Sequence, residues 1–126
     1  MAEDSIDFDA PDLVARIEQL SQHQLDLLPF GVVLLDRRYV VQFYSATEAR
    51  ENGAIAPPLG RDFFEVSQFG GKRDFRARLM RAMDDVPFDF ELALPGNAAN
   101  PRREVRIRAV SARKGGVWMF MERDQL

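Results

Sequence analysis

Few side chains in this sequence have the types and spacing that catalysis or cofactor attachment requires. The 126 residues include one histidine and no cysteine, so disulfides, thiolate zinc sites and cysteine nucleophiles are excluded. His23 lies among polar residues near a predicted helix end, where a surface or capping role is the ordinary one. No serine stands in a nucleophile-elbow motif, and the glycine pairs belong to turns rather than to phosphate-binding loops. The sequence therefore predicts a protein that is not an enzyme and holds no metal.

One segment carries polar side chains that could bind a small polar ligand. Tyr44, Thr47, Glu48 and Arg50 follow a β-rich run within seven positions of one another. The alternative role is structural, because Ser45 and Glu48 stand three residues apart, as in a capping box that opens a helix. Both roles stay open for Thr47 and Glu48.

The hydrophobic pattern indicates which elements must position this segment. Two β-rich runs come first, a helical stretch follows, and three β-rich runs come after it, so that the predicted strands are 30–35, 39–44, 88–94, 104–111 and 117–121. Because a tight turn cannot join the second run to the third, residues 45–85 must cross one face of the sheet. The pattern predicts an α+β fold with one five-stranded antiparallel sheet.

Two of the predicted strands are apolar on both faces. Val32–Leu35 and Val117–Met121 contain no charged residue, whereas residues 105–109 alternate between apolar residues and arginine. An antiparallel sheet with one face in water would alternate in every strand. We therefore expect these two strands to be central and adjacent, with helices across one face and the N-terminal helices, or a dimer partner, across the other.

The N-terminal part of the sequence divides by composition from the β-rich part. The predicted divisions are a flexible acidic arm over residues 1–10, an N-terminal helical cap over residues 11–29, and the main domain over residues 30–126. The apolar residues of the cap recur at helical spacing and form a face that needs a partner surface. Three apolar residues of this cap and the tryptophan of a central strand are the interface candidates: Leu13, Ile17, Leu20 and Trp118.

Bulk composition favours one domain with a packed core and excludes several partner classes. Hydrophobic residues make up 46% of the chain and the net charge is −3, so no global positive charge attracts nucleic acid or an anionic membrane. No apolar run approaches the length of about 20 residues that spans a bilayer, and a cytoplasmic location is expected. The basic residues near the last hairpin are predicted to form a solvated face: Arg102, Arg103, Arg106, Arg108, Arg113 and Lys114.

Several stretches of the sequence resemble PAS domains, and more narrowly the photoactive yellow protein group. The matching stretches are Gln24–Asp36 and Val40–Phe43 at the first two predicted strands, Gly60–Phe64 ahead of the pigment region, and Val117–Arg123 at the last strand. The resemblance covers roughly residues 20–123 and rests on the order and spacing of these stretches together. It implies the PAS fold.

The sequence departs from photoactive yellow proteins where that family holds its pigment. The family attaches a coumaric acid to a cysteine shortly after the Phe-Phe pair, and this sequence has Glu65–Gly70 there. The pigment-binding tyrosine of the family falls on Phe43, and its glutamic acid falls on Thr47, or on Glu48 if the alignment shifts by one. A buried phenolate without donors is costly, so no covalent coumaric acid is expected. Haem is not expected either, since the family's haem-binding members take a histidine from a pocket helix and none is present there, and flavin is not expected.

The resemblance implies a sensory, signal-transduction domain of a bacterial regulator. A cavity between the sheet and residues 45–85 would hold a small noncovalent ligand, with the lining candidates Leu34, Phe43, Thr47, Glu48, Phe63, Phe64, Phe75 and Met119. Occupancy would act through homodimer geometry, a signalling partner or a fused output domain. Two alternatives stay open, which are a ligand-free homodimerisation or docking module and a haem- or flavin-binding redox sensor.

Overall fold

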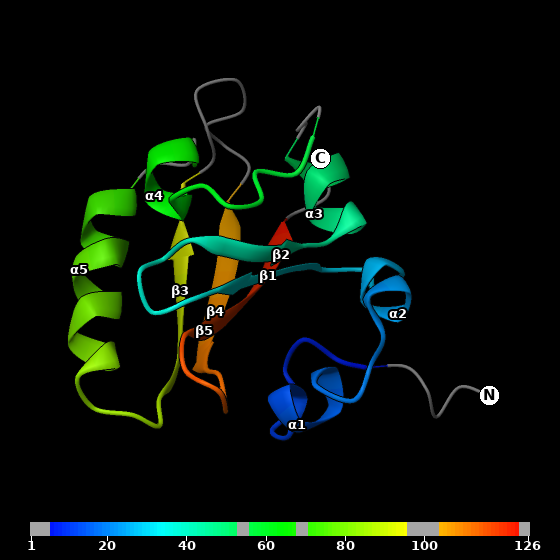
Figure 1. Ribbon diagram of the computed structural model, residues 1–126, viewed down its shortest axis with the longest axis horizontal. Coiled ribbons are helices and arrows are strands. Elements are labelled where there is room, and N and C mark those ends of the chain that lie inside the picture. The colour runs from blue at the N-terminus through cyan, green and yellow to red at the C-terminus, as the bar shows by residue number, and fades with distance from the viewer. Residues whose placement is uncertain (1–5, 53–55, 68–70, 96–103, 124–126) are drawn as a thin grey trace.

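A five-stranded antiparallel sheet forms the middle layer of the protein (Figure 1). The computed structural model describes residues 6–52, 56–67, 71–95 and 104–123. The strands are β1 Gly31–Leu35, β2 Val41–Tyr44, β3 Asp89–Leu94, β4 Val105–Ser111 and β5 Val117–Arg123, in the spatial order β2-β1-β5-β4-β3. The predicted α+β class is confirmed. The two strands that are apolar on both faces, β1 and β5, are adjacent and interior to the sheet, as predicted.

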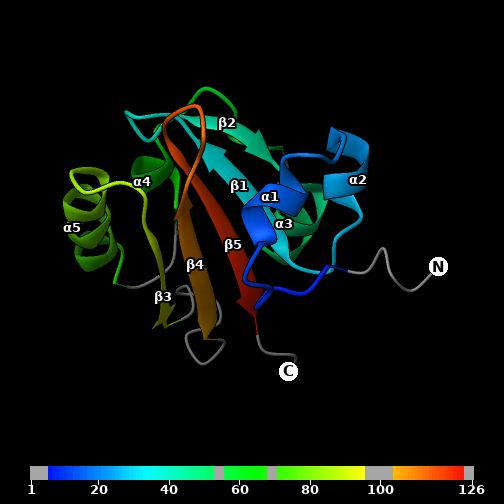
Figure 2. The same cartoon turned by 90° about the horizontal axis from the view of Figure 1, so that it is seen from below.

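Helices cover both faces of this sheet, as Figure 2 shows. The helices are α1 Leu13–Ile17, α2 Gln22–Asp26, α3 Ala46–Glu51, α4 Phe63–Val66 and α5 Lys72–Met83. Helices α4 and α5 lie on one side of the sheet, and α1 and α2, here called the cap, lie on the other. The cap belongs to the same chain, so this part of the sheet is covered without a second copy.

Alternate residues of β5 enter two separate hydrophobic cores. Met119 and Met121 belong to the inner core beneath α4 and α5, and Trp118 and Phe120 belong to the outer core beneath the cap. The inner core includes Val33, Leu35, Val41, Phe63, Phe64, Phe75, Leu79 and Ile107. The outer core includes Ile6, Phe8, Leu13, Ile17, Leu25, Leu28, Phe30 and Val32. Burial on both sides explains why β1 and β5 do not alternate in hydrophobicity.

The predicted flexible arm over residues 1–10 does not hold for its second half, which packs on the sheet. Ile6 and Phe8 are only 7% and 2% exposed. The Phe8 ring packs edge-on against Phe30, with 5.8 Å between the ring centroids. The prediction relied on the acidic composition of this segment. Its apolar residues alternate with the acidic ones, and every second residue faces the protein. The first five residues lie outside the described residues.

The arginines of β4 bind carboxylates of the same chain on the cap side of the sheet. Arg106 lies within 3.0 Å of carboxylate oxygens of Asp9, Glu91 and Glu122. Arg108 forms a two-pronged ion pair with Asp89, at 2.7 and 2.9 Å, and donates to two carbonyl oxygens of the N-terminal segment. The contacts to Asp9 and to the two carbonyl oxygens fix the segment across β4, and the other pairs join β4 to its neighbouring strands. The predicted basic residues Arg102 and Arg103 lie outside the described residues.

Candidate functional site

The eight residues predicted to line one cavity lie on both faces of the sheet. One group is buried in the inner core, where aromatic rings meet edge-on at centroid distances of 5.2 and 5.6 Å: Phe63, Phe64, Phe75 and Met119. Leu34 and Phe43 are cross-strand partners on the opposite face, half-buried against the outer core. The structure separates these two groups because successive residues of a strand point to opposite faces.

Thr47 joins α3 to the end of the cap. Its hydroxyl donates to the Leu28 carbonyl oxygen at 2.6 Å, and the Asp26 carbonyl oxygen lies 3.2 Å away. The backbone N–H of Ala46 donates to the Asp26 carboxylate at 2.7 Å. Three polar contacts therefore hold the first turn of α3 against the last residue of α2 and the segment that follows it.

Glu48 forms a buried ion pair with Arg123 in β5. Only 2% of Glu48 is exposed, and its two carboxylate oxygens accept hydrogen bonds from Arg123 at 2.6 and 2.8 Å. A Cβ atom at Gly31 would overlap this carboxylate, so the start of β1 requires glycine. The predicted capping box is half formed, because the Ser45 hydroxyl accepts from the Glu48 amide at 3.2 Å while the Glu48 side chain turns to Arg123.

The Tyr44 phenol belongs to the same polar cluster and is held neutral. Burial raises the pKa of Tyr44 to about 12, and the negative charge of Glu48 acts in the same direction. Asn52 donates to the phenol oxygen at 3.1 Å. No buried side-chain nitrogen or oxygen atom of the described residues lacks a hydrogen-bond partner, so this cluster is satisfied within the fold.

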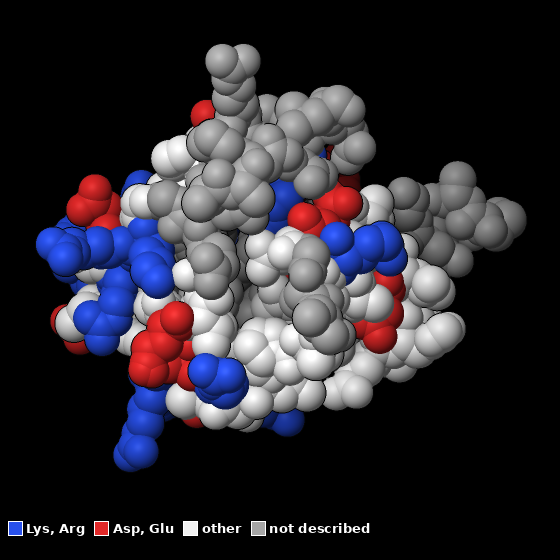
Figure 3. All heavy atoms as spheres, turned by 90° about the horizontal axis from the view of Figure 1, so that it is seen from above, with Lys and Arg blue, Asp and Glu red and all other residues white. Residues whose placement is uncertain are grey.

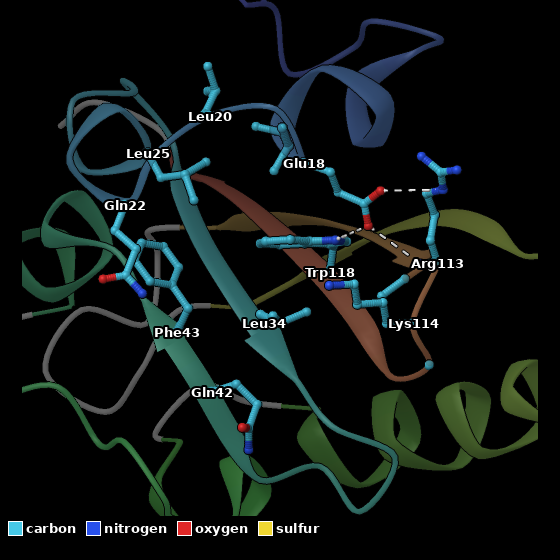
Figure 4. Close-up of a pocket in the computed structure, with 13 residues that line it drawn as sticks. Glu18, Leu20, Gln22, Leu25, Leu34, Gln42, Phe43, Arg113, Lys114 and Trp118 are labelled. Atoms are coloured by element: carbon cyan, nitrogen blue, oxygen red, sulfur yellow. Dashed lines mark hydrogen bonds and ion pairs between the residues drawn. The ribbon is translucent and has the colours of Figure 1, made fainter.

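An open groove with a volume of about 790 Å³ lies between the cap and the sheet (Figure 4). Its apolar lining residues are Ile17, Leu20, Leu25, Leu34, Phe43, Ala112 and Trp118, and its other lining residues are Glu18, Gln22, Gln42, Arg113, Lys114 and Gly115. Leu34 and Phe43 were predicted as cavity residues, and the groove contains both. It lies on the face of the sheet opposite to the one that the sequence indicated.

Glu18 is the polar anchor of the groove. Its carboxylate accepts a hydrogen bond from Trp118 Nε1 at 3.1 Å and one from the Arg113 backbone N–H at 3.4 Å. The Arg113 guanidinium lies 4.0 Å from the same carboxylate. Sequence reasoning missed Glu18, because locally it resembles any carboxylate on the polar side of an amphipathic helix. Its partner Trp118 is 100 residues away in the chain.

The predicted interface residues mostly face inward. Leu13 and Ile17 are fully buried and Trp118 is 7% exposed, all within the outer core. Leu20 is half-buried and lines the groove. A second copy could reach Leu13 or Ile17 only after the cap had left the sheet.

The described residues hold no cluster of three or more His, Asp or Glu side chains that could bind a metal ion. His23 is exposed on α2, outside the groove. Within the described part of the chain, no helix is both long enough and apolar enough to cross a membrane.

Basic side chains gather at the end of the molecule where α5 lies, as Figure 3 shows. The basic residues of this helix are Lys72, Arg73, Arg76, Arg78 and Arg81. Two of them pack on aromatic rings, with Arg78 lying 4.4 Å from the centroid of the Phe90 ring and Arg76 lying 5.9 Å from that of Tyr39. This surface is separate from the groove.

Comparison with known proteins identifies the fold. No protein-family model matches the sequence, and no curated protein matches it. Solved structures do match. The photoactive yellow protein domain of the sensor histidine kinase Ppr from Rhodospirillum centenum has a TM-score of 0.65 and 23% identity, covering 86% of this chain and 97% of that domain.

Two further solved structures show the same architecture. The PAS domain of an HTR-like protein from Haloarcula marismortui has a TM-score of 0.64 and 13% identity, covering 87% of this chain and 96% of that one. A PAS domain from Colwellia psychrerythraea has a TM-score of 0.61 and 9% identity, covering 81% and 92%. The predicted PAS fold, with its likeness to a photoactive yellow protein domain and without a cysteine, is confirmed.

Proposed function

We propose that this chain is a sensory signal-transduction module that binds a small noncovalent ligand in the groove between the cap and the sheet. The fold supports this role, because the structures similar to it include the photoactive yellow protein domain of a sensor histidine kinase. Fold alone does not assign an activity, so the proposal depends on the site. The observation that carries it is the groove, whose lining comes from both the cap and the central strands.

A ligand in this groove would contact two parts of the fold, the cap and the sheet, and under this proposal their relative position can change. Leu20 and Leu25 come from the cap, and Leu34 and Trp118 come from the sheet. A ligand shifts an equilibrium when it binds one arrangement of such parts more tightly than another. The position of the cap is therefore the structural quantity that ligand binding would change.

Hydrogen bonds connect the cap to the far end of β5. Thr47 ties the end of the cap to α3, and the next residue, Glu48, ties α3 to Arg123. A shift of the cap would strain the Thr47 contact first and the buried ion pair next. Coupling of this kind needs a measurement rather than spatial proximity alone.

Native mass spectrometry combined with hydrogen exchange tests the sensory proposal. We expect protein purified under mild conditions to carry a small molecule, and its removal to speed amide exchange in α1 and α2 more than in β4. A protein that carries no small molecule, and whose Trp118 emission responds to none of a broad metabolite set, would contradict the proposal.

A second candidate function is homodimerisation or docking without a ligand. Leu27 favours it, because this α2-adjacent side chain is 71% exposed beside a hollow lined also by Ile6, Leu20, Leu28 and Pro29. Under this alternative, Leu27→Ser would shift the mass measured by light scattering from dimer to monomer. Leu59→Ser is the matched control, since Leu59 is 56% exposed and lies outside that hollow.

A further inference from the structure

We propose that the groove binds an organic anion, whose apolar body packs along the groove and whose carboxylate or similar group pairs with Lys114. This inference rests on the proposed function, because it names the ligand class for the same site. Three observations support it: the apolar lining, the balance of charge around the groove, and the shape of the groove.

Apolar side chains from several elements line the groove. Leu25 comes from α2, Leu34 from β1, Phe43 from β2 and Trp118 from β5. Leu34 and Phe43 are only half-buried, so part of their surface faces the groove. Covering such surface removes it from water, which is favourable. The ligand therefore needs an apolar body, and a small inorganic anion does not fit this requirement.

Among the described residues, one cation of the groove lining has no partner. Glu18 is engaged by the Trp118 indole and by Arg113. Lys114 makes no hydrogen bond or ion pair with any described residue, and its side chain extends toward Trp118 in Figure 4. With one carboxylate and two basic side chains, the lining is positive, although the whole chain has a net charge of −3. A ligand anion would complete this set, whereas a cationic ligand would meet repulsion.

The dimensions of the groove favour a small molecule over a macromolecule. Its volume of about 790 Å³ lies within the range of about 300 to 1,000 Å³ that is usual for small-molecule sites. The cap bounds one side and the turn between β4 and β5 bounds another, which leaves a concave site rather than a flat surface. A second copy of the chain is the competing occupant, and the experiment below distinguishes it.

Trp118 provides the readout, because it is the one tryptophan in the chain and lies in the wall of the groove. The probes are decanoate and 1-decanol, which share an apolar chain and differ in charge, each used below its aggregation limit. We expect both to change Trp118 emission saturably, with decanoate binding more tightly than decanol at low salt. Lys114→Gln should weaken decanoate about fivefold, as expected for one exposed charge pair, and leave decanol unchanged.

Arg73→Gln is the matched control, because it removes one positive charge from α5, away from the groove. It should leave both dissociation constants unchanged. Equal binding of decanoate and decanol, an unaltered decanoate affinity in Lys114→Gln, or no saturable change with either probe would overturn the proposed ligand class. An emission change that depends on protein concentration rather than on probe would assign the groove to a second copy and overturn it as well.

Hydrogen exchange on the same samples separates this inference from the sensory role. Decanoate that binds through Lys114 without slowing exchange in α1 and α2 would support the ligand class and contradict the sensory function. A cap that responds equally to decanol would keep the sensory function and contradict the anion preference.

Discussion

Glu48 and Arg123 show how one buried pair can join distant parts of this chain. Glu48 is nearly inaccessible, and 10% of the Arg123 side chain is exposed. Two hydrogen bonds compensate the loss of hydration of both charges. The pair is therefore sensitive to removal of one partner, since the other would remain buried and charged.

Replacing Glu48 by glutamine should destabilise the protein strongly. The remaining Arg123 would lose its counter-ion inside the fold, and we expect the free energy of unfolding to fall by about 3 kcal/mol. Urea denaturation measures this change. The control is Glu91→Gln, because Glu91 pairs with Arg106 at the surface, and the expected loss there is below about 1 kcal/mol. Equal losses in the two variants would show that the Glu48 pair contributes no more to the free energy of unfolding than a surface pair.

Tyr44 gives the stability of the protein a dependence on alkaline pH. Its pKa is raised from 10.0 to about 12 in the folded protein. As pH rises from 10 toward 12, the unfolded chain loses this proton while the folded protein keeps it, so the free energy of unfolding falls. Denaturation of wild-type and Tyr44→Phe proteins across this range tests the effect. The difference between them should shrink as pH rises, and a constant difference would contradict the shifted pKa.

Sequence reasoning identified Thr47 and Glu48 as residues of interest but could not identify their partners. Both were predicted either to bind a ligand or to open a helix, and the structure uses both in contacts between elements. Arg123 lies 75 residues from Glu48 in the chain. No local pattern encodes such a contact, because it depends on which strands become neighbours.

The elements themselves were largely predictable because each carries its own pattern. The alternation in β4 and the apolar runs in β1 and β5 indicated strands, and their two-sided hydrophobicity indicated that β1 and β5 are neighbours. The face that each residue of β1 or β5 occupies was not predictable. A strand that is apolar on both sides does not indicate which of its side chains enter which core. Leu34 was therefore grouped with Met119, although Leu34 pairs with Trp118 in the sheet.

The junction between α3 and the cap should respond to loss of one hydroxyl group. Thr47→Val keeps the side-chain shape but removes the donor to the Leu28 carbonyl oxygen. We expect a loss of about 1 to 2 kcal/mol in the free energy of unfolding and faster amide exchange in α2.

The matched control for this junction is Thr47→Ser, which keeps the hydroxyl and should retain slow exchange in α2. Thermal denaturation and hydrogen exchange measured on both variants separate the hydrogen bond from side-chain packing. A valine variant whose α2 exchanges as slowly as that of the serine variant would show that packing alone holds the cap.

The whole protein should not absorb or respond to visible light. It has the PAS fold and resembles a photoactive yellow protein domain, but it has no cysteine to form a thioester. We expect the purified protein to show no visible absorption band, and incubation with an activated coumaric acid derivative to leave its mass unchanged. A stable mass increase equal to one coumaroyl group would contradict this expectation.

The shared strand β5 has a consequence for how the chain reaches its native state. Gly31 pairs with Met121. During synthesis β1 is therefore made about 90 residues before its neighbour β5. Neither hydrophobic layer can close before then, because Met119 completes one and Trp118 completes the other. Such nonlocal closure slows folding and leaves nascent strands open to aggregation. Once formed, the two layers depend on one strand, and both are expected to melt together in a single cooperative transition.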